Sequence, residues 1–173
     1  MQIRRYQPAD AGALAQIFFD AVRLGAAPKY TAAELAAWAP ERPSAAAWAQ
    51  RLDGLTTVVA ESPSGLLGFM SLRSDGYLDL AFVRPDCRGT GVADALHSEI
   101  LTEARARQLH RLTTETYAHR HLHIRAMEAA GHRHEGTLRD HVLVAGRPTD
   151  ALVHGILAAD WGRQRHPPTA ACV

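Results

Sequence analysis

The chain has 173 residues, of which 47% are hydrophobic and 21% are charged, and its formal net charge is +1. This length supports one domain with a hydrophobic core and is too short for two. The near-neutral charge argues against nucleic acid or an anionic membrane as a partner. The two cysteines, Cys87 and Cys172, make neither a disulfide framework nor a zinc ligand set.

Targeting and membrane signals are missing from the sequence as it stands. The first residues, 1–5, lack the apolar core of a signal peptide, and the longest apolar runs, such as residues 78–83, have the length of a strand. We therefore expect a cytoplasmic protein without a membrane segment.

The first half of the chain predicts a strand, three helices and then three strands. Residues 2–6 alternate like a strand, and apolar residues recur at helical spacing over residues 10–24. Thr31 and Glu34 form a capping-box pattern that opens a short helix through Trp38, and another helix is expected over residues 44–52. Strand-like segments follow at 55–62, 66–73 and 76–83, and tight-turn compositions join them. These segments predict an antiparallel meander.

The second half predicts two helices, each followed by strands. A helix is expected from residue 92 to about 107, and then a strand at 111–117. Residues 119–130 are compatible with a helix that ends at Gly131, and strands at 133–144 and 149–157 flank a hairpin turn. The domain should span residues 1–160, and residues 161–173 should form a flexible tail.

A glycine-rich segment, residues 83–93, joins the third strand of the meander to the following helix. Gly89 and Gly91 remove side chains where a ligand would approach the backbone, and the first helical turn offers unpaired N–H groups to an anion such as a diphosphate. A Walker loop is excluded because the chain has one lysine, Lys29, far upstream. The dinucleotide fingerprint fails at its third glycine, where Asp94 stands.

The remaining pattern, Arg/Gln-x-x-Gly-x-Gly/Ala, is satisfied by Arg88, Gly91 and Ala93. It resembles the coenzyme A loop of the GNAT superfamily of N-acetyltransferases. Residues 30–40 are similar to small bacterial members with a Trp-Ala-Pro element, and residues 135–151 to ribosomal-protein-alanine and phosphinothricin-type acetyltransferases. The resemblance covers residues 2–160. It implies the GNAT acyl-CoA N-acyltransferase fold, an α/β (α+β) domain with a mixed, mostly antiparallel sheet and helices on both faces.

The resemblance also implies acetyl-CoA as co-substrate, with its pantetheine pairing along the strand before the loop and its diphosphate over the loop amides. The matching positions of this sequence are Leu80, Ala81, Phe82, Val83, Arg88, Gly89, Thr90, Gly91, Val92 and Ala93.

Two carboxylates compete for the role of general base toward the incoming ammonium group. Asp79 should share a strand face with Tyr77, Ala81 and Val83, where burial would raise its proton affinity. The alternative for Asp79 is a pairing with an arginine or a backbone cap. Glu115 lies on the neighbouring strand, on one face with Thr113 and Tyr117, and the sequence does not rank the two.

The tyrosine by which the family commonly protonates the leaving sulfur aligns with Met127 here, and the usual Gly-Phe pair is Gly131-His132. We expect Met127 to be a packing residue. Because a coenzyme A thiolate is a fair leaving group, activity does not require an acid at this position. Tyr117 and His119 are the candidates that could substitute for it.

Histidines recur at residues 119, 121 and 123, but helical residues two apart diverge, so we expect no metal site. Cys87 lies beside Arg88 near a helix N-terminus, an environment that lowers a thiol pKa, yet its position in the family is variable and we interpret it as a loop residue.

The sequence thus predicts an N-acetyltransferase that moves an acetyl group to a primary amine by direct attack. A small-molecule amine, such as an amino acid, a polyamine or an amine antibiotic, ranks first as acceptor, and a protein N-terminus ranks second. A non-catalytic acyl-CoA-binding module is the alternative from another class. The family's usual assembly implies a homodimer.

Overall fold

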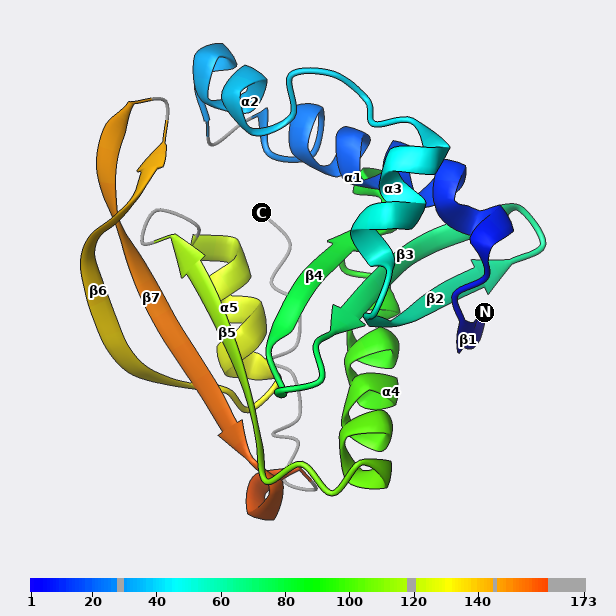
Figure 1. The fold of residues 1–173 in the computed structure, drawn as a ribbon, viewed down its shortest axis with the longest axis vertical. Coiled ribbons are helices and arrows are strands. Elements are labelled where there is room, and N and C mark those ends of the chain that lie inside the picture. Colours follow the sequence, from blue (N-terminus) through cyan, green and yellow to red (C-terminus); the bar gives the residue numbers. More distant parts are fainter. Residues whose placement is uncertain (28–29, 118–120, 145, 162–173) are drawn as a thin grey trace.

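The fold contains two sheets, seen in a computed structural model that describes residues 1–27, 30–117, 121–144 and 146–161 (Figure 1). The first sheet has four strands in the order β1-β2-β3-β4, and every neighbouring pair is antiparallel. Its strands are β1 (Gln2–Arg5), β2 (Thr56–Ser62), β3 (Gly65–Leu72) and β4 (Leu78–Val83). The predicted meander is confirmed.

The second sheet has three strands in the order β5-β7-β6, again antiparallel. These are β5 (Arg111–Tyr117), β6 (Arg133–Val144) and β7 (Arg147–Leu157). The last of the described strands, β7, therefore lies in the middle, with β5 on one side and its hairpin partner β6 on the other.

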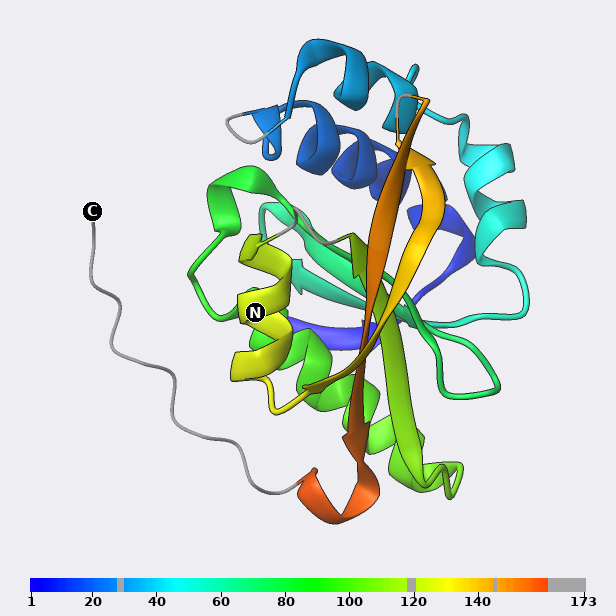
Figure 2. The ribbon, with the colours of Figure 1, turned by 90° about the vertical axis from the view of Figure 1, so that its left-hand side faces the viewer.

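Helices cover both faces, as predicted (Figures 1 and 2). On one side lie α1 (Ala11–Arg23), α2 (Ala32–Trp38) and α3 (Ala45–Leu52); on the other lie α4 (Val92–Ala106) and α5 (His121–Ala129). The Thr31 hydroxyl accepts a hydrogen bond from the Glu34 amide, and the Glu34 carboxylate accepts one from the Thr31 amide, which confirms the predicted capping box. Among the described residues, no helix is long and apolar enough to cross a membrane.

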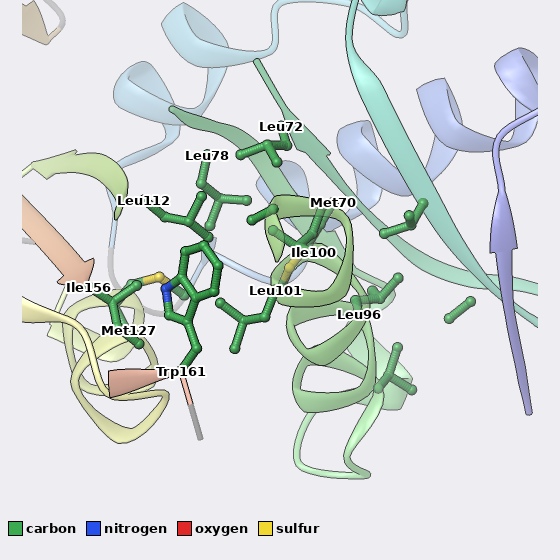
Figure 3. Close-up of a cluster of buried hydrophobic side chains, with 14 residues drawn as sticks. Met70, Leu72, Leu78, Leu96, Ile100, Leu101, Leu112, Met127, Ile156 and Trp161 are labelled. Atoms are coloured by element: carbon green, nitrogen blue, oxygen red, sulfur yellow. The ribbon is translucent and has the colours of Figure 1, made fainter. Parts of the chain in front are cut away.

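The main hydrophobic core lies between the sheets and the helices α4 and α5 (Figure 3). Met127 is 4% exposed and packs there beside Leu112, Ile156 and Trp161, so its predicted packing role is confirmed. Trp161 is also 4% exposed. The packed domain therefore extends one residue past the boundary at residue 160 that the sequence indicated, and residues 162–173 lie outside the described part.

A second apolar cluster joins α1 and α3 to the opposite face of the first sheet. The Phe18 ring stacks on Trp48 with centroids 4.8 Å apart, and Trp48 meets Phe69 edge to face. Trp48 is thus a core residue that anchors α3, as a large aromatic residue on a short helix usually is.

A pair of buried histidines links α4 to the segment between α5 and β6. The Nε2 atoms of His97 and His132 lie 3.0 Å apart, and both side chains are almost completely buried. Burial lowers the pKa of His97 to about 4 and that of His132 to about 3; nearby His154 and His123 lower the latter further, while Asp94 acts in the opposite direction on His97. The pair is neutral in the folded protein at neutral pH.

The histidine pair predicts a loss of stability in mild acid. Because the folded pKa values lie below the unfolded value near 6.5, this stability is complete above pH 6.5 and declines as the pH falls toward 4. We expect the pair to account for a loss of roughly 2 to 4 kcal/mol in unfolding free energy between pH 7 and pH 5. Urea unfolding across this range measures it.

The double variant His97→Leu/His132→Phe should flatten this part of the stability profile. His110→Gln, a change at an exposed histidine, is the control and should leave the profile as it is. A double variant with the same pH dependence as the parent would contradict the assignment.

Candidate functional site

The strands β4 and β5 meet at one end and then separate (Figure 1). Tyr77 and Thr113 form a parallel bridge, the Thr113 amide donates to the Gly76 carbonyl at 3.0 Å, and the Thr114 hydroxyl donates to the Leu78 carbonyl at 3.1 Å. Beyond this bridge the strands belong to different sheets. Among the described residues, no strand pairs with the edge of β4 that faces β5. We call this opening the split.

A β-bulge in β4 lies at the start of the split. Ser71 of β3 pairs with Leu80 and Leu72 pairs with Leu78, so Asp79 is an extra residue without a partner on β3. Such a bulge bends the strand and interrupts the alternation of its side chains. The split begins where this irregularity falls.

The bulge makes one prediction wrong. Tyr77, Asp79, Ala81 and Val83 were expected on one face, from a period of two. Instead Leu78 joins Ala81 and Val83 in the core on the α4 side, whereas Asp79 contacts α3 on the opposite side of the sheet. The extra residue shifts the period by one within the strand.

Asp79 forms an ion pair with Arg51 of α3, with Oδ2 2.5 Å from Nη2. Its side chain is 15% exposed, so it lies partly buried beneath the guanidinium group. The arginine pairing, one of the two alternatives for Asp79, is therefore present in the structure.

Glu115 lies across the split from Asp79, on β5. Leu112, Thr114 and Thr116 are buried toward the core, so Glu115 projects from the opposite face together with Thr113 and Tyr117, as predicted. Its carboxylate is about one-third exposed, and Oε2 lies 3.7 Å from His141 Nε2 of β6.

Tyr77 stands at the closed end of the split, between the two carboxylates. Burial raises the pKa of Tyr77 above its usual value, and the charges of Glu115 and Asp79 raise it further. The phenol therefore keeps its proton at neutral pH and is available as a donor.

The strand β4 leads through the short 3-10 helix η3 (Pro85–Cys87) into residues 88–91, which we call the glycine loop. Gly89 has φ of 73° and Gly91 has φ of 85°, values that favour glycine, and Gly91 is the N-cap residue of α4. Val92 is buried in the core, which anchors the first turn of α4, while Gly89, Thr90 and Ala93 are exposed. The first amides of α4 thus open at the surface beside the end of β4.

Both arginines beside the glycine loop have engaged guanidinium groups. Arg84, the residue before η3, pairs with Asp86 of η3. Arg88, which the motif places among the coenzyme-binding residues, donates to the carbonyl groups of Ala21 and Gly25 at the end of α1.

Cys87 differs from the expectation for its environment. Burial raises the pKa of the Cys87 thiol, and the neighbouring Asp86 carboxylate, 3.6 Å from the sulfur, raises it further. The prediction that the helix N-terminus and Arg88 lower this pKa is wrong, because Arg88 points to α1 and Asp86 lies closer. The interpretation of Cys87 as a loop residue fits this chemistry.

Tyr117 and His119 are the two candidates to replace the acid that Met127 does not provide. Tyr117 is half-buried at the end of β5, and His119 lies outside the described residues. Residues 121–144 and the rest of the described chain hold no cluster of three or more side chains that could bind a metal ion.

Sequence reasoning missed Arg51 and the position of Tyr77 between the two carboxylates. Arg51 is 28 residues from its partner Asp79, so no local pattern indicates the pair. A carboxylate alone in an apolar strand was the available signal that a cation faces it.

Comparison with known proteins agrees with this geometry. Residues 26–123 match the family described as the acetyltransferase (GNAT) domain. The uncharacterized N-acetyltransferase YafP of Escherichia coli is 38% identical over 96 residues, which are 56% of this chain and 62% of that relative, so the match spans less than two thirds of its length.

Two solved structures share the fold over nearly their whole length. The ribosomal-protein-alanine N-acetyltransferase of Brucella melitensis has a TM-score of 0.74 and 27% identity, covering 91% of this chain and 99% of its own. A phosphinothricin acetyltransferase of Sinorhizobium meliloti, solved in complex with acetyl-CoA, has a TM-score of 0.71 and 20% identity, covering 99% and 98%. With a family match over more than half of its residues, a split between β4 and β5, and a glycine loop that opens α4, the chain belongs to the GNAT acetyltransferase family.

Proposed function

We propose that this protein transfers the acetyl group of acetyl-CoA to a primary amine of a small molecule by direct attack. The observation that carries the proposal is the split: an unpaired edge of β4 that leads into the glycine loop, with a carboxylate on each side. This arrangement supplies a place for an extended donor, an anion site at its end and groups that can handle a proton.

The donor would lie along the free edge of β4. The pantetheine arm has amide groups that can pair with the backbone of residues 80–83, and the diphosphate would rest on the amides of residues 89–93 at the start of α4. Gly89 and Gly91 leave room here, because a Cβ atom added at either would meet nothing within 4 Å. The thioester would then reach the closed end of the split.

The acceptor would enter on the face that carries Asp79 and Glu115. That face is bounded by α2 and α3 on one side and by the hairpin of β6 and β7 on the other (Figures 1 and 2). Both carboxylates attract an ammonium group, which favours a cationic amine as the species that binds.

Glu115 is the group that we propose as general base. The Asp79 carboxylate is already engaged by Arg51, whereas the Glu115 carboxylate is accessible, with His141 3.7 Å away. Glu115 would accept a proton from the ammonium group, directly or through water, so that the neutral amine attacks the thioester carbonyl. Asp79 and Arg51 would then orient the acceptor.

Collapse of the tetrahedral intermediate would release coenzyme A as a thiolate. Met127 is buried in the core and brings no proton to this step. Since a thiol with a pKa near about 8.5 leaves readily as its anion, no acid is required at neutral pH.

Release of coenzyme A from acetyl-CoA in the presence of a panel of amines tests the function, with a thiol reagent as detector. Gly91→Glu should abolish release and weaken acetyl-CoA binding by more than about tenfold in calorimetry, because its carboxylate would face the diphosphate.

Gly91→Gln is the matched control, since it has the same size and the same strained φ of 85°. It should bind acetyl-CoA more tightly than Gly91→Glu. Unchanged affinity in a folded Gly91→Glu variant would exclude the loop as the diphosphate site, and binding without release with any amine would favour an acyl-CoA-binding module.

Glu115→Gln should lower kcat by about 10²-fold to 10³-fold and remove the acidic limb of the pH–rate profile, while the affinity for acetyl-CoA stays the same. Asp79→Asn is the comparison. It should raise the KM of the amine and keep the acidic limb. If Asp79→Asn instead removes that limb and Glu115→Gln has no effect, the base is Asp79.

Met127→Leu should keep kcat within about threefold and change the melting temperature by only a few degrees, because the substitution conserves volume in the core. Met127→Tyr should destabilise the fold, since its hydroxyl would be buried beside Ile156 and Trp161. Calorimetric melting and steady-state kinetics measure both. A folded Met127→Leu variant without turnover would show that the sulfur has a chemical role.

A further inference from the structure

Helix α1 ends in an unusual way. The carbonyl of Asp20 accepts hydrogen bonds from the amides of both Leu24 and Gly25, at 2.9 Å and 3.0 Å. In a regular helix the Gly25 amide would bond the carbonyl of Ala21. That carbonyl instead faces Arg88 Nη2 at 3.3 Å, and the Nη1 of the same guanidinium donates to the Gly25 carbonyl.

Arg88 thus serves as the C-terminal cap of a helix that lies 63 or more residues before it in the chain. A cation at this end of a helix is favourable, because the unpaired carbonyl groups carry partial negative charge. A side chain at position 25 has no room: a Cβ atom there would lie 2.1 Å from Arg88 Nη2 and 2.7 Å from the backbone oxygen of Ala21. The φ angle of Gly25 is not positive, so the lack of room for a side chain, and not the backbone conformation, explains the glycine.

The contact bridges a place where α1 and the segment after β4 are not closely packed. A hollow of about 460 Å³ lies between them, lined by α1 residues such as Gln16 and Asp20 and by Arg84, Pro85 and Asp86. The Arg88 guanidinium reaches the end of α1 beside this hollow. Its two hydrogen bonds therefore connect the glycine loop to the end of α1, and we call this contact the strut.

The end of α1 leads into α2, which bounds the acceptor face. The ring of Tyr30, which precedes α2, packs on Trp38 at the end of that helix with centroids 5.8 Å apart, and α2 contacts β6. Contacts that hold the end of α1 in place therefore also hold α2, which the acceptor would meet. We call α2 the acceptor wall.

We propose that Arg88 is a positioning residue that ties the glycine loop to the acceptor wall, and that the diphosphate is held by backbone amides without this side chain. The inference rests on the proposed function. When a diphosphate orders the glycine loop, the backbone of Arg88 is fixed, and its guanidinium then holds the end of α1 and the start of α2 in place. Donor binding would in this way prepare the acceptor side.

Two measurements on Arg88→Ala test the proposal. Calorimetry should give an affinity for acetyl-CoA within about threefold of the parent, because no diphosphate contact is lost. The KM of the amine should rise by about tenfold or more, since charged hydrogen bonds that hold the acceptor wall are gone, with a smaller change in kcat.

Hydrogen exchange provides a readout that needs no acceptor. Addition of acetyl-CoA should protect amides of residues 21–26 and 30–38 in the parent and should fail to do so in Arg88→Ala. Gly25→Ala crowds both the guanidinium and the Ala21 carbonyl group that it bonds, so it should break the contact from the side of α1 and show the same loss of protection. Arg88→Lys keeps the charge but cannot span two carbonyl groups, so it should resemble Arg88→Ala.

A different pattern would overturn the proposal. If Arg88→Ala loses acetyl-CoA affinity by tenfold or more and Arg88→Lys restores it, the side chain is a diphosphate ligand. If both Arg88→Ala and Gly25→Ala keep the parent's exchange response and amine KM, the strut has no positioning role. If the proposed function itself is wrong, the parent protein will not bind acetyl-CoA. That result differs from both of the outcomes above.

Discussion

The pairing between β4 and β5 lasts for one bridge, Tyr77 with Thr113, and the extra residue of β4, Asp79, comes two residues later. Because a bulge bends the strand and increases its twist, β4 turns away from its neighbour where a regular sheet would have continued. The free edge of β4, the separation of the two carboxylates and the direction in which the chain enters the glycine loop all depend on this local departure from regular pairing.

The two sides of the split serve different physical purposes. Toward α4 and α5, side chains such as Leu78, Leu112 and Met127 form a close-packed interior, which holds the strands in position. Toward α2 and α3 the same strands carry Asp79 and Glu115, which remain partly accessible. A rigid interior on one side fixes the strands from which the charged groups on the other side project, as a preorganised site requires.

Local patterns in the sequence predicted most of the fold. The capping box at Thr31, the glycines of residues 88–91 and the alternation in β5 depend on neighbours within a few residues, and the structure contains all three. The face of β4 was predicted wrongly because a bulge is defined by pairing with β3 and leaves no mark in a six-residue strand. The partners of Asp79 and Arg88 were beyond reach for the same reason, since each bond joins segments far apart in the chain. The motif alone did not indicate that Arg88 contacts the end of α1.

The strand order β5-β7-β6 has a consequence for the growing chain. The first sheet is complete once residue 83 has been made, so it can begin to fold while the rest is still being synthesised. The second sheet cannot form until its central strand, β7 (Arg147–Leu157), leaves the ribosome. Its other two strands, β5 and β6, pair only with β7 and not with each other. Until then β5 has unpaired backbone on an exposed edge, a state that invites pairing with other chains. The far side of the split thus forms later than the first sheet, and β5 is open to misassembly until then.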